Sequence, residues 1–215
     1  MREAKRCTIN SMKIVPQILE KIESAHSQVV VVTKYFNAEE TQAIFKELQK
    51  HPSFLAMGEN RIHEIGAKNI PREYMHFIGN IQSRNVASIV KYCSVVHSLW
   101  NEKHAKKINK IGKMDGFVQV NISRESQKSG VLPEDLPAFL EILKALKNIT
   151  VLGISAMGVS SFSIESKRAE FIRLKQLRDK HIPEGKISAG TSRDFQIALE
   201  EGIDIVRVGQ AIFDL

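Results

Sequence analysis

The sequence predicts an α/β protein, a single (β/α)8 TIM barrel with an extra N-terminal helix. Four consecutive valines at 29–32 are too continuous for a half-exposed strand and are typical of a parallel strand covered on both faces. Strand and helix patterns then alternate through eight units, the number that closes this barrel. No break in composition separates the units, so residues 1–215 are expected to form one domain, lean beside the typical length of about 250 residues.

The first half of the chain shows four of these units. An extra helix is predicted over residues 9–27, where apolar residues recur on one stripe. The first strand covers residues 28–34, and Asn37 is placed to cap the next helix, with Glu40 reaching back to it. The later strands of this half are expected at residues 54–57, 74–78 and 94–99, and the helices at residues 37–50, 62–65, 82–92 and 101–111.

The second half repeats the alternation. Pro133 is expected at the start of a helix, which tolerates Pro137 only within its first turn. Later helices are expected at residues 164–180 and 193–201, and strands at residues 116–121, 150–155, 186–188 and 205–208. A parallel barrel brings the carboxyl ends of all these strands to one face, where active sites of this fold lie.

Composition limits the class of protein. The net charge of +7 permits an acidic partner such as a phosphate ligand or a nucleic acid. The charged N-terminus has no apolar run behind it and no window is long enough to span a bilayer, so we expect a cytoplasmic protein without a membrane partner. Cys7 and Cys93 lack metal-like spacing and suit a reducing compartment.

Lys34 stands where the first strand ends and its loop begins. One interpretation is a lysine that extends from a strand end into water. The other is a lysine partly desolvated by apolar neighbours, whose amine is a nucleophile that forms Schiff bases with aldehydes.

The loops after the seventh and eighth strands have features of an anion site. Residues 188–192 are rich in Gly, Ser and Thr and run into a helix, where the N–H groups of Arg193 and Asp194 favour an anion. Gly209 follows the eighth strand, where a ligand can approach the backbone closely. The plain alternatives are a helix N-cap for Ser192 and a tight turn for Gly209. Their common position at adjacent strand ends favours a phosphate site.

An amine and a phosphate cradle across one barrel mouth suggest a ligand with an aldehyde at one end and a phosphate at the other. Pyridoxal 5′-phosphate (PLP) has this chemistry, with Lys34 as the Schiff-base amine.

The chain also resembles a known family from about residue 28 to its end. The motifs that carry the resemblance are VTK at 32–34, GENR at 58–61, HFIGNIQS at 76–83, QVNI at 119–122 with Lys128 and Gly130 downstream, Gly190 with Ser192 and Asp194, and RVGQAIF at 207–213. With these motifs the sequence resembles the YggS/PROSC family of PLP homeostasis proteins, which share the barrel of the alanine racemase N-terminal domain.

The resemblance implies a set of cofactor-binding residues. These are Lys34 as the PLP lysine, Asn60 near the cofactor, Ile81 against the ring, Arg207 near the ring nitrogen, and Ser192, Gly209 and Gln210 around the phosphate. A charged arginine beside the ring nitrogen keeps that nitrogen unprotonated, because two adjacent cations repel, and an unprotonated ring is a poorer electron sink.

Four positions depart from the family pattern. Ala189 and Thr191 replace methionines, Gln210 replaces a threonine or serine, and Met57 replaces an aromatic residue. Thr191 and Gln210 concern the phosphate contacts, whereas Lys34 is unaffected.

The resemblance implies a PLP carrier in intracellular PLP homeostasis, with little or no catalytic turnover and no catalytic residue. The alternative is a PLP-dependent amino-acid racemase, which needs a base on each face of its substrate. In alanine racemases one base is a tyrosine from a second domain of a partner subunit, for which this chain has no room. We therefore expect a monomer that binds PLP, with PLP-dependent apo-enzymes as candidate recipients.

Two further classes are less favoured. Lys103, Lys106, Lys107 and Lys110 lie on one helix face and suggest nucleic-acid binding, yet Ala105, Ile108 and Ile111 predict an apolar opposite face, which makes the lysines a solvated side. His76 and His97 end neighbouring strands, but a catalytic zinc site needs three protein ligands. We expect neither a nucleic-acid partner nor a bound metal.

Overall fold

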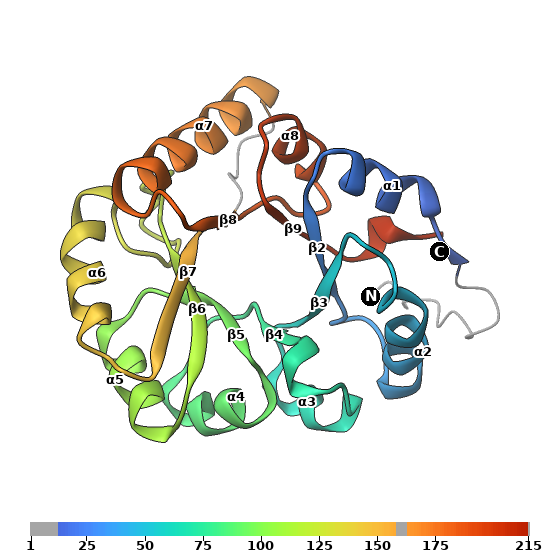
Figure 1. The fold of residues 1–215 in the computed structure, drawn as a ribbon, viewed down its shortest axis with the longest axis horizontal. Coiled ribbons are helices and arrows are strands. Elements are labelled where there is room, and N and C mark those ends of the chain that lie inside the picture. The colour runs from blue at the N-terminus through green and yellow to red at the C-terminus, as the bar shows by residue number, and fades with distance from the viewer. Residues whose placement is uncertain (1–12, 158–162, 215) are drawn as a thin grey trace.

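The computed structural model describes residues 13–157 and 163–214, and its centre is a closed barrel of eight parallel strands, as predicted (Figure 1). The barrel strands are β2 (Gln28–Val32), β3 (Phe54–Glu59), β4 (Met75–Phe77), β5 (Val95–Leu99), β6 (Met114–Gln119), β7 (Ile149–Ser155), β8 (Lys186–Ser188) and β9 (Ile205–Val208). Each pairs with its neighbour in parallel, and β9 closes the barrel against β2 with Val31 opposite Val208. The ends of the first and last barrel strands are therefore adjacent.

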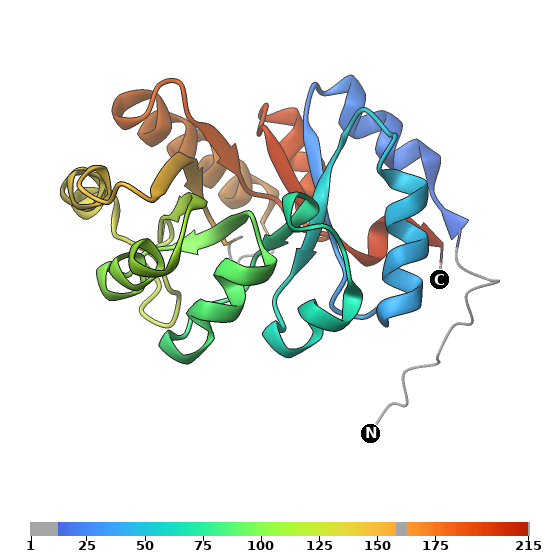
Figure 2. The same ribbon diagram turned by 60° about the horizontal axis from the view of Figure 1, so that its bottom comes forward.

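Helices surround the barrel, as the two views show (Figures 1 and 2). They are α1 (Pro16–Ser24), α2 (Ala38–Leu48), α3 (Ile62–Lys68), α4 (Val86–Tyr92), α5 (Glu102–Ile111), α6 (Leu136–Lys144), α7 (Ile164–His181) and α8 (Phe195–Glu200). Short 3₁₀ turns join them at η2 (Arg72–Tyr74), η3 (Ser83–Asn85), η4 (Pro133–Asp135) and η5 (Gln210–Ile212). None of the described helices combines the length and apolarity that crossing a bilayer requires.

Local signals fix several helix starts where we predicted them. The Asn37 side chain accepts the N–H of Glu40 at 2.9 Å, and the Glu40 carboxylate accepts the N–H of Asn37 at 2.8 Å, a complete capping box at α2. Pro137 falls in the first turn of α6, where its missing N–H has no helical partner to lose.

The N-terminal element differs from the expectation of one helix over residues 9–27. Pro16 begins α1, because a proline at the first helical position loses no hydrogen bond. Before it, β1 (Lys13–Ile14) pairs antiparallel with β10 (Phe213–Asp214). Residues 9–12 lie outside the described part of the chain. The two ends of the described chain are thus paired beside the barrel.

Alternate residues of each strand point into the barrel, where they stack in layers. One of these layers is apolar and another is polar. Val30, Val95, Phe117 and Ile205 form a separate buried cluster away from the main core between sheet and helices. Two residues beyond Val95 and Ile205, the inward positions of β5 and β9 hold His97 and Arg207. Polar side chains, one of them charged, therefore lie near the carboxyl end of the barrel.

Candidate functional site

Lys34 lies at the tip of a tight turn directly after β2. The N–H of Phe36 donates to the carbonyl of Thr33 at 3.0 Å, so Lys34 and Tyr35 are the two central residues of the turn. The buried Phe36 ring packs edge-on against Phe213 at 4.9 Å between centroids, which holds the turn against the end of the chain. The turn thus presents the lysine at the carboxyl end of the barrel.

The Lys34 side chain is half-buried, and in the described part of the chain its amine forms no ion pair. The nitrogen lies 4.8 Å from the ring centroid of Tyr35, a cation–π distance, and Tyr35 itself is 56% exposed. An amine that no carboxylate holds is available to an incoming electrophile. A lysine that extends into water is equally unpaired, so the choice between the two interpretations of Lys34 is left to the proposal below.

A buried ion pair holds the backbone at the start of this turn. Lys68, at the end of α3, is fully buried and pairs with the fully buried carboxylate of Glu59. The Lys68 ammonium also donates to the carbonyl of Thr33 at 2.8 Å, and the Thr33 hydroxyl donates to Glu59 at 3.2 Å. Because Thr33 precedes Lys34, the ion pair fixes the backbone from which Lys34 projects.

Glu59 also orders the loop that holds Asn60. One oxygen of its carboxylate accepts the N–H groups of Asn60 at 2.8 Å and Arg61 at 2.9 Å. Gly79, which follows β4, packs directly against the backbone of Asn60. A Cβ at position 79 would lie only 2.7 Å from the carbonyl oxygen of Asn60, so only glycine fits there. Asn60 is exposed at the end of β3, and Ile81 is buried beyond β4.

Sequence reasoning missed the Lys68 ion pair. A lysine seven residues into a short helix resembles a solvated end residue, and only its long apolar stem allows the ammonium to reach Thr33. Glu59 belongs to the GENR motif at 58–61, but no local pattern identifies Lys68 as its partner.

Arg207 projects from β9 into the barrel and is fixed by carbonyl groups. One terminal nitrogen donates to the carbonyl of Ser188 at 2.6 Å and to its hydroxyl at 2.9 Å, and the other donates to the carbonyl of Ala156 at 2.8 Å. Burial lowers the pKa of Arg207 to about 10, which leaves it charged at neutral pH. The guanidinium is therefore a fixed positive charge at the end of the barrel.

Two histidines continue the polar layer from Arg207. His97 Nδ1 lies 2.8 Å from the Ser188 hydroxyl, and His97 Nε2 lies 3.0 Å from His76 Nδ1. Burial lowers the pKa of His76 to about 3, and burial, His76 and Arg207 together lower the pKa of His97 well below its usual value. The pair is neutral and hydrogen-bonded, and no group of three or more metal-ligand side chains occurs among the described residues.

The buried histidines predict a pH dependence of stability. The pKa of folded His76 is about 3, below its unfolded value of about 6.5, so its contribution is complete above pH 6.5 and is lost as the pH falls toward 3. We expect the contribution of His76 alone to the free energy of unfolding to decrease by up to about 1.4 kcal/mol per pH unit in this window. Urea unfolding of wild type and His76→Gln from neutral pH to about pH 4 measures it. The variant is expected to have the shallower dependence, and parallel curves would contradict the assignment.

Ser192 and Gly209 meet beside the turn of Lys34. The N–H of Gly209 points at the Ser192 hydroxyl oxygen, at 3.4 Å. A Cβ on Gly209 would lie 3.2 Å from the carbonyl oxygen of Val32, so this loop abuts the end of β2. Since Lys34 is two residues beyond Val32, the structure brings the predicted amine and the predicted anion cradle to neighbouring strand ends.

The helix after this loop begins later than predicted. α8 starts at Phe195, and the N–H of Asp194 donates to the carbonyl of Thr191 at 2.9 Å instead of facing an anion. The buried Asp194 carboxylate accepts the N–H and the hydroxyl of Thr191, at 2.6 and 2.9 Å. The expectation of a free Asp194 N–H is therefore wrong, and Thr191 has a structural role in closing the loop.

Gln210 is exposed and begins η5, directly after Gly209. Within the described residues its side-chain amide forms no hydrogen bond to the loop of Ser192, which donates and accepts through Gly209, Thr191 and Asp194 instead. Of the seven predicted site residues, Lys34, Ser192, Gly209 and Gln210 thus lie on the three loops that follow β2, β8 and β9, and Arg207 lies on β9 inside the barrel.

The basic face of α5 is partly neutralised. Lys106 pairs with Glu102 at 2.5 Å, and Lys107 donates to the carbonyl of Ser83 at 2.7 Å. Ala105 and Ile108 are buried as predicted, but Ile111 is 45% exposed because the helix ends there at Gly112. These contacts fit the solvated side of a packed helix.

A family model for the N-terminal domain of alanine racemase matches residues 17–215. Relatives named pyridoxal phosphate homeostasis proteins are similar over most of the chain. The relative from Aquifex aeolicus is 33% identical over 171 residues, 73% of this chain and 75% of its own length. The relative from Deinococcus radiodurans is 30% identical over 214 residues, 93% of this chain and 99% of its own length.

Solved structures of PipY from Synechococcus elongatus share the fold. The form without PLP aligns with a TM-score of 0.77 and 25% identity, and the form with PLP bound with a TM-score of 0.75 and 24% identity. Each alignment covers 92% of this chain and 100% of PipY. The match to the family model and the identities to the named relatives place the chain: it belongs to the alanine racemase N-terminal domain family and, within it, to the pyridoxal phosphate homeostasis proteins.

Proposed function

We propose that this chain is a PLP-binding protein of intracellular PLP homeostasis, with PLP attached covalently to Lys34 and little or no catalytic turnover. The single observation that carries the proposal is that the loop after β9, where Gly209 meets Ser192 of the loop after β8, also abuts the end of β2, two residues before Lys34. The names of its relatives and the bound PLP of PipY support the same ligand.

The side chains at this end of the barrel fit the cofactor. Lys34 supplies an amine free of ion pairing in the described residues, which suits an aldehyde. The Ser192 hydroxyl would donate to a phosphate, the Gly209 N–H, which is directed at the Ser192 oxygen at 3.4 Å, would be shared between that oxygen and the phosphate, and Gln210 would add its amide. Asn60 and Ile81 would contact the ring from the loops after β3 and β4. Bound PLP supplies a reactive aldehyde and an electron-withdrawing ring.

Arg207 would control whether the nitrogen of the bound PLP ring is protonated. Its guanidinium is immobilised by Ser188 and Ala156 and remains charged at neutral pH. A fixed cation near the ring nitrogen disfavours protonation of that nitrogen, because like charges repel. With an unprotonated nitrogen the ring withdraws electrons from a substrate poorly. Arg207 therefore favours a protein that holds the aldehyde over one that catalyses a reaction on it.

The tyrosines of the chain bear on the racemase alternative. Tyr35 shares a turn with Lys34 and lies against its amine, so both groups approach a ligand from one side. The Tyr74 ring packs against Phe45 at 5.2 Å, and Tyr92 lies beside Lys91 on α4. A racemase needs bases on opposite faces, and this arrangement does not place a tyrosine opposite Lys34.

We further propose that residues 1–215 form one monomeric domain that acts in the cytoplasm and delivers PLP to PLP-dependent apo-enzymes. The closed barrel and the family match over residues 17–215 support one domain.

A comparison of PLP with 5-deoxypyridoxal tests the cradle and the amine together. 5-Deoxypyridoxal keeps the aldehyde and lacks the phosphate. Two donors to a charged phosphate, at about 1.5–3 kcal/mol each, predict an affinity for PLP at least about a hundredfold higher. Titration by visible absorbance measures both affinities. Equal affinities would contradict the phosphate cradle, and alanine racemisation at the rate of a dedicated racemase would contradict the carrier role.

A further inference from the structure

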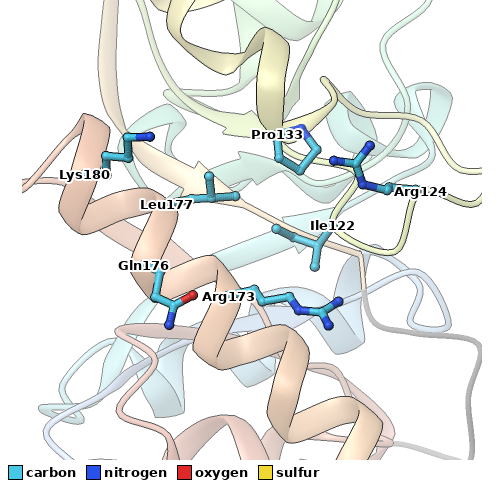
Figure 3. A pocket seen from close by; sticks show the side chains of 7 residues that line it. All are labelled: Ile122, Arg124, Pro133, Arg173, Gln176, Leu177 and Lys180. Atoms are coloured by element: carbon cyan, nitrogen blue, oxygen red, sulfur yellow. The ribbon is translucent and has the colours of Figure 1, made fainter.

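A cavity of about 390 Å³ lies between α7 and the loop that joins β6 to α6 (Figure 3). Its apolar side chains are the buried Ile122, Leu177 of α7 and Pro133 at the start of η4. Among the described residues that line it, none belongs to the candidate PLP site and none is aromatic. The cavity is therefore a separate apolar recess beside the barrel.

The free cations of the cavity are separated by two helical turns. Arg173 and Lys180 are seven residues apart on α7, so their Cα atoms are about 10 Å apart along the helix axis. Figure 3 shows them on either side of Leu177. Both side chains are exposed, and in residues 13–157 and 163–214 neither forms an ion pair or a side-chain hydrogen bond. The apolar recess thus has an unpaired cation at each end.

The other polar groups of the cavity are neutral or neutralised. Arg124 donates to both oxygens of Glu134, at 2.8 and 2.9 Å, so this guanidinium and this carboxylate satisfy each other. The exposed Gln176 lies between the two free cations along α7, and its amide both donates and accepts. A peptide group also has one N–H and one carbonyl, so Gln176 is suited to pair with a peptide backbone.

This arrangement favours a protein segment over smaller anions. A single phosphate or carboxylate cannot bridge two cations at opposite ends of the recess, and single-stranded nucleic acid needs aromatic platforms that the described lining lacks. In an extended peptide, side chains at positions i, i+2 and i+4 share one face and span about 13 Å. Two acidic residues at the ends of that span are within reach of the long Arg173 and Lys180 side chains, and the central residue then lies over the recess.

The surface around the cavity fits the same kind of partner. Ile172 is 41% exposed and lies one turn before Gln176, at the rim. Exposed apolar side chains beside a recess are typical of a surface that binds another protein. The net charge of +7 attracts an acidic partner at long range.

We propose that this cavity docks a partner protein through an extended segment in which an aliphatic residue is flanked, two positions away on each side, by acidic residues. The aliphatic side chain enters the recess between Leu177 and Ile122, and the two carboxylates pair with Arg173 and Lys180. The proposal does not rest on PLP binding at Lys34.

NMR titration of the PLP-loaded, ¹⁵N-labelled protein with the capped peptide Ser-Glu-Ser-Leu-Ser-Glu-Ser tests the proposal. Saturable binding is expected, with shift changes at α7 and the loop of Ile122. Alanine in place of the peptide leucine is expected to weaken binding about tenfold, because the apolar contact is lost. The rearranged peptide Ser-Leu-Ser-Ser-Glu-Glu-Ser has the same composition and charge and is expected to bind at least about threefold more weakly.

Three results of this titration would overturn the proposal. The first is no saturable binding of the designed peptide. The second is equal binding of the rearranged peptide, which would indicate general charge attraction only. The third is equally tight binding of octanedioate or of a short single-stranded RNA at the same residues, which would assign the cavity to another class of ligand.

A charge swap connects the binding to the two cations. The double variant Arg173→Glu with Lys180→Glu is expected to lose measurable binding of the acidic peptide and to bind Ser-Arg-Ser-Leu-Ser-Arg-Ser instead, which also shows that the variant is folded. Lys103→Glu with Lys110→Glu is the matched control, because these lysines are exposed, seven residues apart on α5 and in no ion pair among the described residues. The control is expected to bind the acidic peptide within about twofold of wild type. An equal loss in both double variants, or no binding of the arginine peptide by the first, would contradict the docking site.

Discussion

Replacing Lys34 with alanine is expected to abolish the visible absorbance that PLP gains on binding the wild-type protein. In the proposed site the Lys34 amine condenses with the aldehyde, so the variant would retain only the proposed phosphate contacts around Ser192 and Gly209. Lys34 is half-buried at the tip of a turn whose hydrogen bond is between backbone atoms, and its loss leaves the turn intact. The absorbance spectrum after PLP addition and gel filtration measures the effect, and unfolding by urea checks the fold.

Lys91 provides a matched control for this variant. Its nitrogen lies 4.8 Å from the ring of Tyr92, the same arrangement and distance as Lys34 and Tyr35. Lys91 is exposed at the end of α4, away from the barrel mouth. Lys91→Ala is expected to keep the full visible band. A band that survives in Lys34→Ala, or one lost equally in Lys91→Ala, would refute the assignment of the amine.

Of the substitutions discussed here, Lys68→Met is expected to cause the largest loss of stability, about 3–5 kcal/mol in the free energy of unfolding. Methionine fills the volume of the stem but removes the charge, which leaves the fully buried Glu59 carboxylate without its cation. The carbonyl of Thr33 also loses a donor at 2.8 Å, so the turn of Lys34 is loosened and PLP binding weakens with it. Urea unfolding and the PLP titration measure the two effects.

The control for Lys68→Met is an exposed pair of the same chemistry. Lys106→Met removes the partner of Glu102 on α5, where both side chains are in water, and is expected to cost less than about 1 kcal/mol. The double variant Lys68→Met with Glu59→Gln is expected to recover part of the loss, because the unpaired charge is gone. Equal losses for the buried and exposed pairs would contradict the role given to Lys68.

Much of the fold follows from local signals in the sequence. The valine run of β2 and the Asn37–Glu40 capping box depend on neighbouring residues only, and the structure confirms both. The β1–β10 pair at residues 13–14 and 213–214 was not predictable in this way, since two residues of strand are too few to show a period and their partner lies at the other end of the chain.

The candidate site shows the same division. The positions of Lys34 and Gly209 at strand ends follow from the alternation of elements, and the family motifs supply the roles that their positions alone leave open. The contacts that hold these positions in place join residues distant in sequence. Lys68 reaches Thr33 across 35 residues and Arg207 reaches Ala156 across 51, and a periodic pattern does not encode either contact.

The cavity on α7 illustrates a further limit of sequence reasoning. Its helix stripe, Arg173 to Lys180, is visible as a spacing, but cations on a helix face are ordinary solvated residues unless an apolar wall faces them. That wall comes from Ile122 and Pro133, some fifty residues earlier, and only the packing of α7 against their loop reveals it.

The most direct test of the central claim is to reduce the PLP-loaded protein with borohydride, digest it and locate the modified lysine by mass spectrometry. Reduction makes the bond between the amine and the cofactor permanent. The expected result is one phosphopyridoxyl group per chain, on the peptide that contains Lys34. A label found mainly on another lysine, or spread over the exposed lysines of the surface, would contradict the account.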